Sequence, residues 1–500
     1  MMPRITWLQG KSRLILCASL ALLFALASTS LAFANETLIR ISSDPYTNSS
    51  SQHKTQVEPD VYSFGSTVVA TFQSGRFFNG GASNIGWATS HDGGATWTHG
   101  FLPGTTVYAT PAGPYRRVSD PSVAYDPKHG VWIISLLGIV NPSTGPVDVI
   151  ASRSTDGGLT WSNPVVVNSS GNFNDKNWTT CDTWKSSPFY GNCYTEFDDA
   201  SGNNLVQMST STDGGLTWGP AKTSADHALV IGGQPVVQPN GNVIVPITVF
   251  KKNFSIANVS AFRSTNGGQS WSKTIKITAF DLFFEPSFVR NGLGLVSAQV
   301  DASGTVYVVW ADCRFEPGCT ANDIVMSTSK DGITWSRVQL IPIDPVGSGI
   351  DHFLPGIGVR RFEGTAHLGL VYYSYPNANC STNTCVLDVG FISSENGGSS
   401  WSQAEQLAGP LKLTWLASTN QGYMAGDYMA TTVVPDDDAV PVFMVAQKPD
   451  SGTKCTRGVV CHEATYTTPE DALLIKGGTI SSQAAPTGAG LLAPLWRTAN

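Results

Sequence analysis

Acidic residues that precede strand-like runs are the first residues in this sequence that could carry chemistry. Glu58, Asp120 and Asp427 stand at corresponding places in three segments, and Tyr428 follows the last of them. Asp175 lies near the corresponding place in a fourth segment. Carboxylates gathered in one site raise one another's pKa, which is the condition that acid–base catalysis uses. The alternative is structural, because an aspartate at a strand end often accepts hydrogen bonds from neighbouring backbone amides.

Arginine-containing segments supply candidates for holding an anionic group of a substrate. Arg76 lies in SGRFFNGGASN, and both Asp312 and Arg314 lie in WADCRFEPGCTANDI. A guanidinium group binds a carboxylate through two parallel hydrogen bonds, which makes arginine the natural partner of such a group. We therefore predict that the substrate is bound by these three residues together with His352 and Asp175.

A repeated turn motif indicates the scaffold that must position these residues. The octamer STDGGLTW occurs twice, and its relatives share the frame Ser-x-Asp/Asn-x-Gly-x-Ser/Thr-Trp, one of them a residue shorter. The copies end at Trp97, Trp161, Trp218, Trp271, Trp335 and Trp401. The Asp or Asn accepts hydrogen bonds from its own turn, the glycines permit positive φ, and the tryptophan buries surface against the sheet. We predict hairpin-closing turns that belong to the scaffold rather than to the active site.

The spacing of these turns predicts the fold. Consecutive tryptophans of the motif are on average about 61 residues apart, and strand patterns such as GQPVVQPNGNVIVPI precede each turn. One further unit, DYMATTVVPDDDAVPVFMVAQ, lacks the turn. This pattern predicts an all-β fold, a β-propeller of four-stranded antiparallel blades, seven in number with six as the alternative. The early strand TLIRIS would complete the last blade, and the acidic residues above would gather where the inner strands enter a central funnel.

The repeated turn resembles the Asp box of the sialidase (neuraminidase) superfamily and of other BNR-repeat proteins. The resemblance covers almost the whole chain after residue 34 and implies a glycosidase of the exo-α-sialidase type. It also implies a tyrosine nucleophile, for which Tyr428 fits best by position, an aspartate as acid/base, and an arginine cluster. The chain departs from the family at two places. Val57-Glu58-Pro59 stands where the family has Arg-Ile-Pro, and SGRFFNGGASN, where the acid/base is expected, contains no aspartate.

The N-terminal segment and the cysteines indicate secretion to the extracellular space. Residues 1–34 combine early basic residues, an apolar run and an A-x-A-like site, the pattern of a cleaved signal peptide. We assign residues 35–476 to the propeller and residues 477–500 to a flexible C-terminal tail. The remaining cysteines form four local pairs, which we expect to be disulfides: Cys181 and Cys193, Cys313 and Cys319, Cys380 and Cys385, Cys455 and Cys461.

Charge and composition argue against several classes of partner. The net charge is −7, and the sequence has no cluster of Lys and Arg that a nucleic acid would require. After the signal segment no apolar run is long enough to span a membrane, and we expect a monomer. No cofactor is expected. The segment FDDASGNN leaves room for a structural calcium ion, although a solvated hairpin tip is the simpler interpretation.

These observations lead to one functional hypothesis and two alternatives. We expect hydrolysis of an extracellular glycan at the axial funnel, with Glu58, Asp120, Asp427 and Tyr428 in the acid, base and nucleophile roles. The first alternative is a non-catalytic propeller that binds a glycan or a protein. The second is an axial calcium site that serves the structure alone.

Overall fold

The computed structural model describes residues 37–485, except 143–144, 252–255, 285–288, 291–293, 361–363, 451, 453 and 457–459. The chain divides into two compact units, Met1–Asn35 and Glu36–Asn500, and the second is described here. The predicted signal segment 1–34 and residues 486–500 of the predicted tail lie outside the described residues. No helix of the described part has the length and apolar character needed to cross a membrane.

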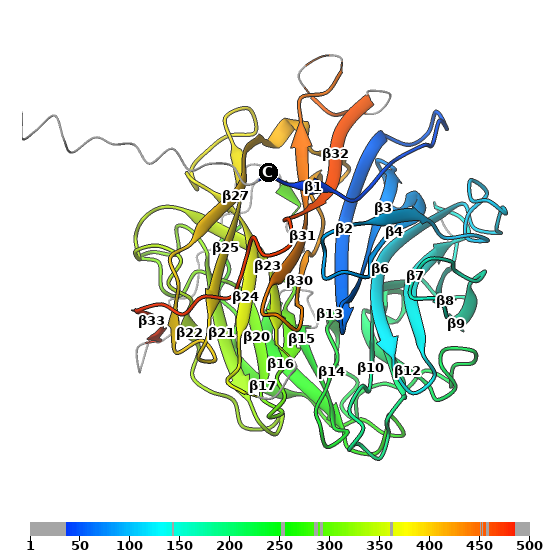
Figure 1. The fold of residues 1–500 in the computed structure, drawn as a ribbon, viewed down its shortest axis with the longest axis horizontal. Coiled ribbons are helices and arrows are strands. Elements are labelled where there is room, and N and C mark those ends of the chain that lie inside the picture. Colours follow the sequence, from blue (N-terminus) through cyan, green and yellow to red (C-terminus); the bar gives the residue numbers. More distant parts are fainter. Residues whose placement is uncertain are drawn as a thin grey trace, which may run out of the picture. The chain divides into compact units, whose positions relative to one another are not determined.

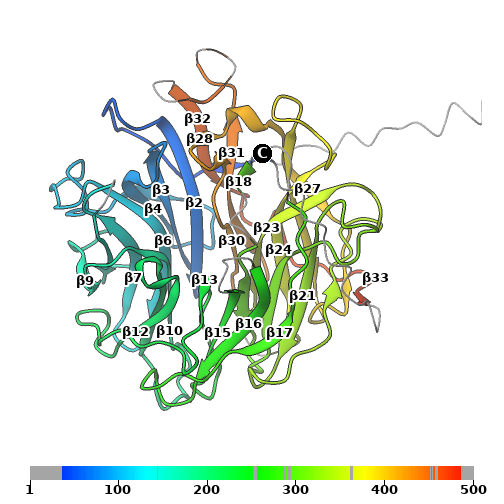
Figure 2. The same ribbon diagram turned by 180° about the vertical axis from the view of Figure 1, so that it is seen from behind.

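The second unit is an all-β propeller in which antiparallel strands follow one another along the chain (Figures 1 and 2). The first part of the chain contributes β2 (His53–Phe64), β3 (Thr67–Arg76), β4 (Ala82–Ser90) and β5 (Thr98–Phe101), then β6 (Arg117–Asp126), β7 (Val131–Ile139), β8 (Val147–Ser154) and β9 (Val165–Asn168). These are followed by β10 (Asn174–Cys181), β11 (Cys193–Asp199) and β12 (Leu205–Ser211). The next set is β13 (Val230–Gly233), β14 (Val236–Val237), β15 (Val243–Phe250), β16 (Ile256–Ser264) and β17 (Ile275–Ala279).

The second half of the unit continues the same antiparallel pattern. The first set is β19 (Ser297–Val300), β20 (Val306–Asp312), β21 (Asp323–Ser329) and β22 (Gln339–Leu340). The second set is β23 (Asp351–Val359), β24 (Leu368–Tyr375), β25 (Val386–Ser394) and β27 (Glu405–Lys412). The last set is β30 (Ala430–Val433), β31 (Ala439–Gln447) and β32 (Val460–Thr467). Shorter strands are β18 (Val289–Arg290), β26 (Ser400–Trp401), β28 (Ala417–Thr419), β29 (Gly422–Met424), β33 (Ile480–Ser481) and β34 (Gln483–Ala484). Helical structure in the described ranges is limited to two 3-10 turns, η1 (Ala200–Gly202) and η2 (Leu413–Trp415).

The two ends of the unit meet in one sheet. Strand β1 (Ile39–Arg40), part of the predicted strand TLIRIS, pairs antiparallel with β32, with Ile39 opposite Thr467. Strand β2 also pairs with β32, in parallel, so the blue and orange ends of the ribbon lie side by side in Figure 1. This pairing covers strand edges that would otherwise be free to bind another chain.

The repeated turns have the hydrogen bonds that their residue types predict. In the copy that ends at Trp161, the Asp156 carboxylate accepts from the backbone N–H of Thr160 at 2.9 Å, and Ser154 Oγ accepts from the N–H of Gly158 at 2.9 Å. The indole N–H of Trp161 donates to the carbonyl of Gly158 at 3.0 Å. Gly158 has a φ of +87°, which a glycine adopts without steric cost. The turns therefore organise strand ends and belong to the scaffold.

All four predicted disulfides are confirmed. They join Cys181 to Cys193, Cys313 to Cys319, Cys380 to Cys385, and Cys455 to Cys461. Each closes a loop of at most 12 residues. The bridges therefore fix local hairpins and loops, and they are compatible with an oxidising compartment.

A bulge recurs in five of the strands that open a set, and it gives one residue of each strand a backbone conformation that differs from the rest of the strand. The pairing register shifts in β2, β6, β10, β13 and β23. The residue at each shift has positive φ: Glu58 (+55°), Asp120 (+48°), Lys176 (+53°), Gly232 (+59°) and Leu354 (+52°). Positive φ is costly for residues other than glycine and is often found at functional sites. The bulge corrects the sequence alignment, because Lys176 rather than Asp175 is equivalent to Glu58.

Candidate functional site

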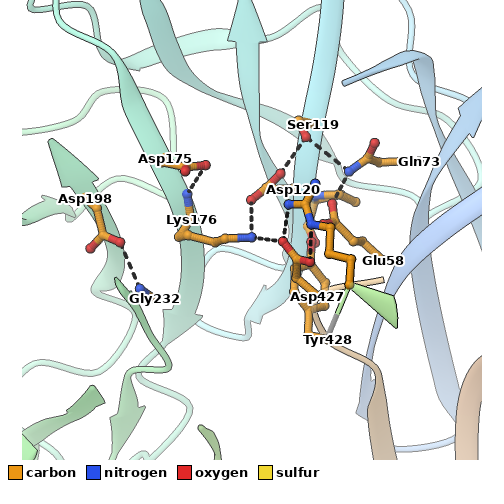
Figure 3. Close-up of polar contacts among 12 residues, drawn as sticks. Glu58, Gln73, Ser119, Asp120, Asp175, Lys176, Asp198, Gly232, Asp427 and Tyr428 are labelled. Atoms are coloured by element: carbon orange, nitrogen blue, oxygen red, sulfur yellow. Dashed lines mark hydrogen bonds and ion pairs between the residues drawn. The ribbon is translucent and has the colours of Figure 1, made fainter. Parts of the chain in front are cut away.

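Charged side chains from several strands meet at the propeller axis. This axial cluster consists of Glu58 on β2, Asp120 on β6, Lys176 on β10, Arg290 on β18, and Asp427 in the segment between β29 and β30. Asp427 accepts a hydrogen bond from Arg290 Nε at 2.6 Å and makes further close contacts with Arg290 Nη2 and Lys176 Nζ (Figure 3). Lys176 Nζ also lies 3.6 Å from the Oδ2 atom of Asp120. One buried carboxylate is thus paired with two cations.

A chain of hydrogen bonds links the acidic residues on the other side of the cluster. Gln73 Nε2 donates to Glu58 Oε2 and also, at 3.1 Å, to Ser119 Oγ (Figure 3). Ser119 Oγ donates to Asp120 at 2.5 Å, and Arg76 Nη1 donates to the side-chain oxygen of Gln73 at 3.1 Å. The second carboxyl oxygen of Glu58 is buried and has no hydrogen-bond partner among the described residues. The network fixes the side chains of Glu58 and Asp120 relative to each other.

The environment drives two carboxyl groups of the cluster to opposite protonation states. Burial raises the pKa of Glu58 to about 8, and the negative charges of Asp120 and Asp427 act in the same direction. Burial also disfavours the charged form of Asp427, but the ion pairs with Arg290 and Lys176 outweigh it and hold that pKa well below its usual range. At neutral pH, therefore, Glu58 is mostly protonated and Asp427 is charged.

Tyr428 lies beside this cluster with its hydroxyl engaged. Its Oη donates to the carbonyl oxygen of Pro121 at 2.9 Å, and its ring packs edge-on against Trp178 with 5.0 Å between ring centroids. Burial raises the pKa of Tyr428 well above its usual value, and the charges of Glu58 and Asp120 add to this effect. The phenol is therefore protonated in this arrangement.

A pocket opens next to Tyr428 and the ion pair. Its volume is about 670 Å³, counting the space that is open to solvent. One part of the wall is polar, formed by Lys176, Asp427 and Tyr428, while Trp178 and Leu354 contribute to its apolar part. Glu58, Asp120 and Arg76 are buried and are not among the lining residues. A ligand in this pocket would touch Tyr428 and Asp427 directly, and the other acidic groups only through them.

A second acidic group lies on the neighbouring strand β11. Glu196 accepts from the backbone N–H of Gly233 at 3.0 Å, and Asp198 accepts from that of Gly232 at 2.8 Å. Burial raises the pKa of both carboxyls well above their usual values. Asp198 was a candidate calcium ligand at a hairpin tip, whereas the structure buries its side chain against β13 (Figure 3).

The remaining predicted residues lie partly or wholly outside the axial cluster. Asp175 is next to Lys176, and its carboxylate accepts from the backbone N–H of that lysine at 3.1 Å; burial raises its pKa to about 6. Arg314 donates to Asp312 at 2.8 Å and to the carbonyl of Ala279 at 2.7 Å, so this pair braces neighbouring strands. His352 lies near Asp323 and Asp344, away from the ion pair.

Two members of the cluster were missed by the sequence analysis. Lys176 occupies the bulge position equivalent to Glu58, and a strict alignment of the bulges would have found it. Arg290 follows no motif, because its place depends on the parallel pairing of β18 with β29, in which Arg290 lies opposite Met424. Only the tertiary structure brings this arginine to Asp427.

Comparison with protein families agrees with the repeated turns. Residues 145–358 match the model of a family described as BNR repeat-like domain. The predicted resemblance to BNR-repeat proteins is thereby confirmed, and the matched residues include β10, which carries Lys176, and the bulge of β23. No curated protein has a significantly similar sequence.

Among solved structures, this chain is similar to glycan-active proteins at low identity. The Hadza microbial sialidase Hz136 is 13% identical, with a TM-score of 0.43 and coverage of 80% of this chain and 76% of that one. A single-residue mutant of NanB sialidase from Streptococcus pneumoniae is 16% identical, with a TM-score of 0.41 and coverage of 89% and 72%. A PL25 ulvan lyase is 11% identical, with a TM-score of 0.47 and coverage of 88% and 95%. Similarity at this level does not assign an activity to this chain.

Proposed function

We propose that this protein acts on a glycan at the axial pocket, as a sialidase-like glycoside hydrolase outside the cell. One observation carries the proposal: Asp427, Tyr428 and Lys176 form one wall of a pocket that Trp178 also lines. A phenol, a carboxylate and an ammonium group are the kinds of groups that cleave glycosidic bonds and hold their substrates. Trp178 offers a flat apolar surface for a sugar ring.

The geometry assigns different parts to the candidate residues. Tyr428 is the candidate nucleophile because it is a lining residue of the pocket. To react, its hydroxyl must leave the Pro121 carbonyl and pass its proton to a base, since a carbonyl cannot take that proton. Glu58 and Asp120 are buried next to Tyr428, and we assign them the role of keeping its hydroxyl protonated, because their charges raise its pKa.

The charge balance at the axis bears on the class of glycan. Lys176 and Arg290 both pair with Asp427, and Arg76 bonds to Gln73, so these cations already have partners within the protein. A sugar carboxylate would have to compete with Asp427 for these cations. Arg314 is bonded to Asp312, so it is not free to bind a sugar carboxylate either. The site therefore suits a neutral glycan better than an anionic glycan that needs a free arginine.

A second candidate function is a non-catalytic glycan-binding propeller. It is favoured by one observation, namely that the hydroxyl of Tyr428 and the carboxylate of Asp427 are both satisfied by protein groups. An axial calcium site is less suitable, because Lys176 and Arg290 provide the positive charge that such an ion would supply.

We further propose seven four-stranded blades, with the repeated turns as their Asp boxes. The antiparallel sets that begin with β2, β6, β10, β13, β19, β23 and β30 support this count. The set of β10, β11 and β12 gains a fourth segment through the bridge between Met208 and Lys222, and β1 completes the set of β30. Secretion as a monomer is part of the same proposal, and the four disulfides support the extracellular location.

The test is hydrolysis of a panel of fluorogenic glycosides, sialosides included, by the secreted protein and by two variants. Tyr428→Phe removes only the hydroxyl and should lower the rate at least about 100-fold if Tyr428 is the nucleophile. Tyr190→Phe is the matched control, because Tyr190 is not a lining residue of the pocket. Cleavage that is equal in both variants would contradict the assigned role. No cleavage by the folded wild-type protein, with retention on a glycan array, would establish the binding function instead.

A further inference from the structure

Three potential metal ligands converge on the border between two strand sets. Asp323 begins β21, His352 lies in β23, and Asp344 lies in the connection between β22 and β23. One ligand atom of each residue lies within 4.8 Å of the other two. Asp323 and His352 are buried, with 4% and 2% of their surface exposed, and Asp344 is half-buried. None of the three belongs to the axial cluster.

The charge of this group is not offset by the protein. The Oδ2 atom of Asp323 is buried and accepts no hydrogen bond from any described residue. The ion pairs among the described residues all lie elsewhere, so no described lysine or arginine pairs with Asp323 or Asp344. A buried carboxylate oxygen without a partner is strongly unfavourable unless a proton or a cation neutralises the group. The unpartnered oxygen of Asp323 is therefore an independent indication that a cation binds here.

The hydrogen bonds of His352 prepare its ring for a metal. Its Nδ1 atom lies 3.3 Å from the carbonyl oxygen of Asn322, and its backbone N–H donates to the same oxygen at 2.8 Å. A carbonyl oxygen only accepts, so this contact places the ring proton on Nδ1 and leaves the lone pair on Nε2. Metal-binding histidines commonly donate their other N–H to a backbone carbonyl in this way.

We propose that Asp323, Asp344 and His352 bind one divalent transition-metal cation, with Zn²⁺ as the best fit. One imidazole nitrogen and two carboxylate oxygens match the ligands of Zn²⁺, which leave a further position for water. Calcium is a poorer match, because it requires six to eight oxygen ligands and does not favour imidazole. The site is separate from the glycan site, so neither proposal depends on the other.

The cation would brace one wall of the axial pocket. Asn322, next to Asp323, exchanges two hydrogen bonds of 2.8 Å with the backbone of Phe283. Leu282 and Phe353, the neighbours of Phe283 and His352 in sequence, line the pocket. A metal that ties β21, β23 and the segment of Asp344 together therefore stabilises the loop and the strand that shape this wall.

The experiment uses the full secreted protein, freed of metal with a chelator and then titrated with Zn²⁺. We expect about one zinc ion per chain by elemental analysis and a melting temperature that rises by about 3 °C at a free Zn²⁺ concentration about 100 times the Kd. Asp323→Asn and His352→Gln should abolish both effects. Asp436→Asn is the control, because it removes one carboxylate from an exposed loop and should leave both effects intact.

Three results would overturn the proposal. The first is no zinc retained by the wild-type protein. The second is an equal rise of the melting temperature in wild type and in both site variants. The third is stabilisation by Ca²⁺ but not by Zn²⁺, which would show that the site does not select a transition-metal cation. Cobalt titration provides a check that does not depend on stability, since the visible absorption of Co²⁺ bound to wild type should change in His352→Gln and not in Asp436→Asn.

Discussion

Lys176 makes an ion pair with Asp427 at the propeller axis, although 251 positions separate them in the sequence. Arg290 pairs with the same carboxylate from a third segment of the chain. Each of these side chains reaches the axis from a different part of the fold, so the ion pairs exist only when the ring is assembled. The axial cluster is thus both a candidate site and a tie between distant strands.

Replacing Asp427 with Asn should destabilise the protein strongly. The substitution leaves the buried Lys176 and the partly buried Arg290 without their shared counter-charge. Breaking a buried pair from one side costs about 3–5 kcal/mol. The free energy of unfolding in urea measures the effect. Glu405→Gln is the control, because the pair of Glu405 with Lys476 is exposed and should contribute nothing measurable. Equal stability of the two variants would show that the axial ion pairs contribute little.

Glu58 should make stability fall as the pH rises. Its pKa is about 8 in the folded protein against 4.5 as the usual value, so the folded state holds the proton more tightly. The stabilising contribution is complete below about pH 4.5 and is lost as the pH rises toward 8, with a slope of about 1.4 kcal/mol per pH unit. Unfolding free energies of wild type and Glu58→Gln between about pH 5 and 8 test this. The variant should gain relative to wild type as the pH rises, and a constant difference would contradict the raised pKa.

Gly398 of the last repeated turn should not tolerate alanine. Its φ is +83°, and an added Cβ would lie 2.4 Å from the side chain of Met326 in the neighbouring set. Gly65 has a similar φ of +59° but open space around it, so Gly65→Ala isolates the backbone cost of about 1–2 kcal/mol. Gly398→Ala should cost about 1–3 kcal/mol more, because of overpacking. Thermal unfolding measures both, and equal losses would mean that Met326 moves freely.

Trp178 should contribute to glycan binding without affecting the rest of the fold. Its ring lines the pocket and packs on Tyr428, so Trp178→Ala should weaken binding of the best glycan about tenfold, or about 1.4 kcal/mol. Trp415→Ala is the control, because Trp415 lies in η2 and is not a lining residue of the pocket. Isothermal titration calorimetry with both variants measures the affinity for the glycan. An equal loss of affinity in both variants would mean that the glycan binds outside this pocket.

The sequence predicted the scaffold because its signals are local. The frame around Asp156 and Trp161 carries the acceptor, the glycines and the aromatic ring of one turn within eight residues, and hydrogen bonds within that turn realise the pattern. Each cysteine pair likewise closes a short loop, so proximity in sequence was sufficient to pair Cys181 with Cys193. Such features do not depend on how the sheets are arranged around the axis.

The composition of the site was decided by the tertiary structure. The sequence by itself determined an all-β repeat scaffold, its disulfides, and the presence of Glu58 and Asp120 in strands that open two of the sets. It could not show that a one-residue bulge turns Lys176 rather than Asp175 toward Asp427, nor that β18 brings Arg290 to the same carboxylate. The physical reason is that charge pairing acts through space: which cations neutralise Asp427, and hence which carboxyl remains protonated, depends on strand register and ring closure.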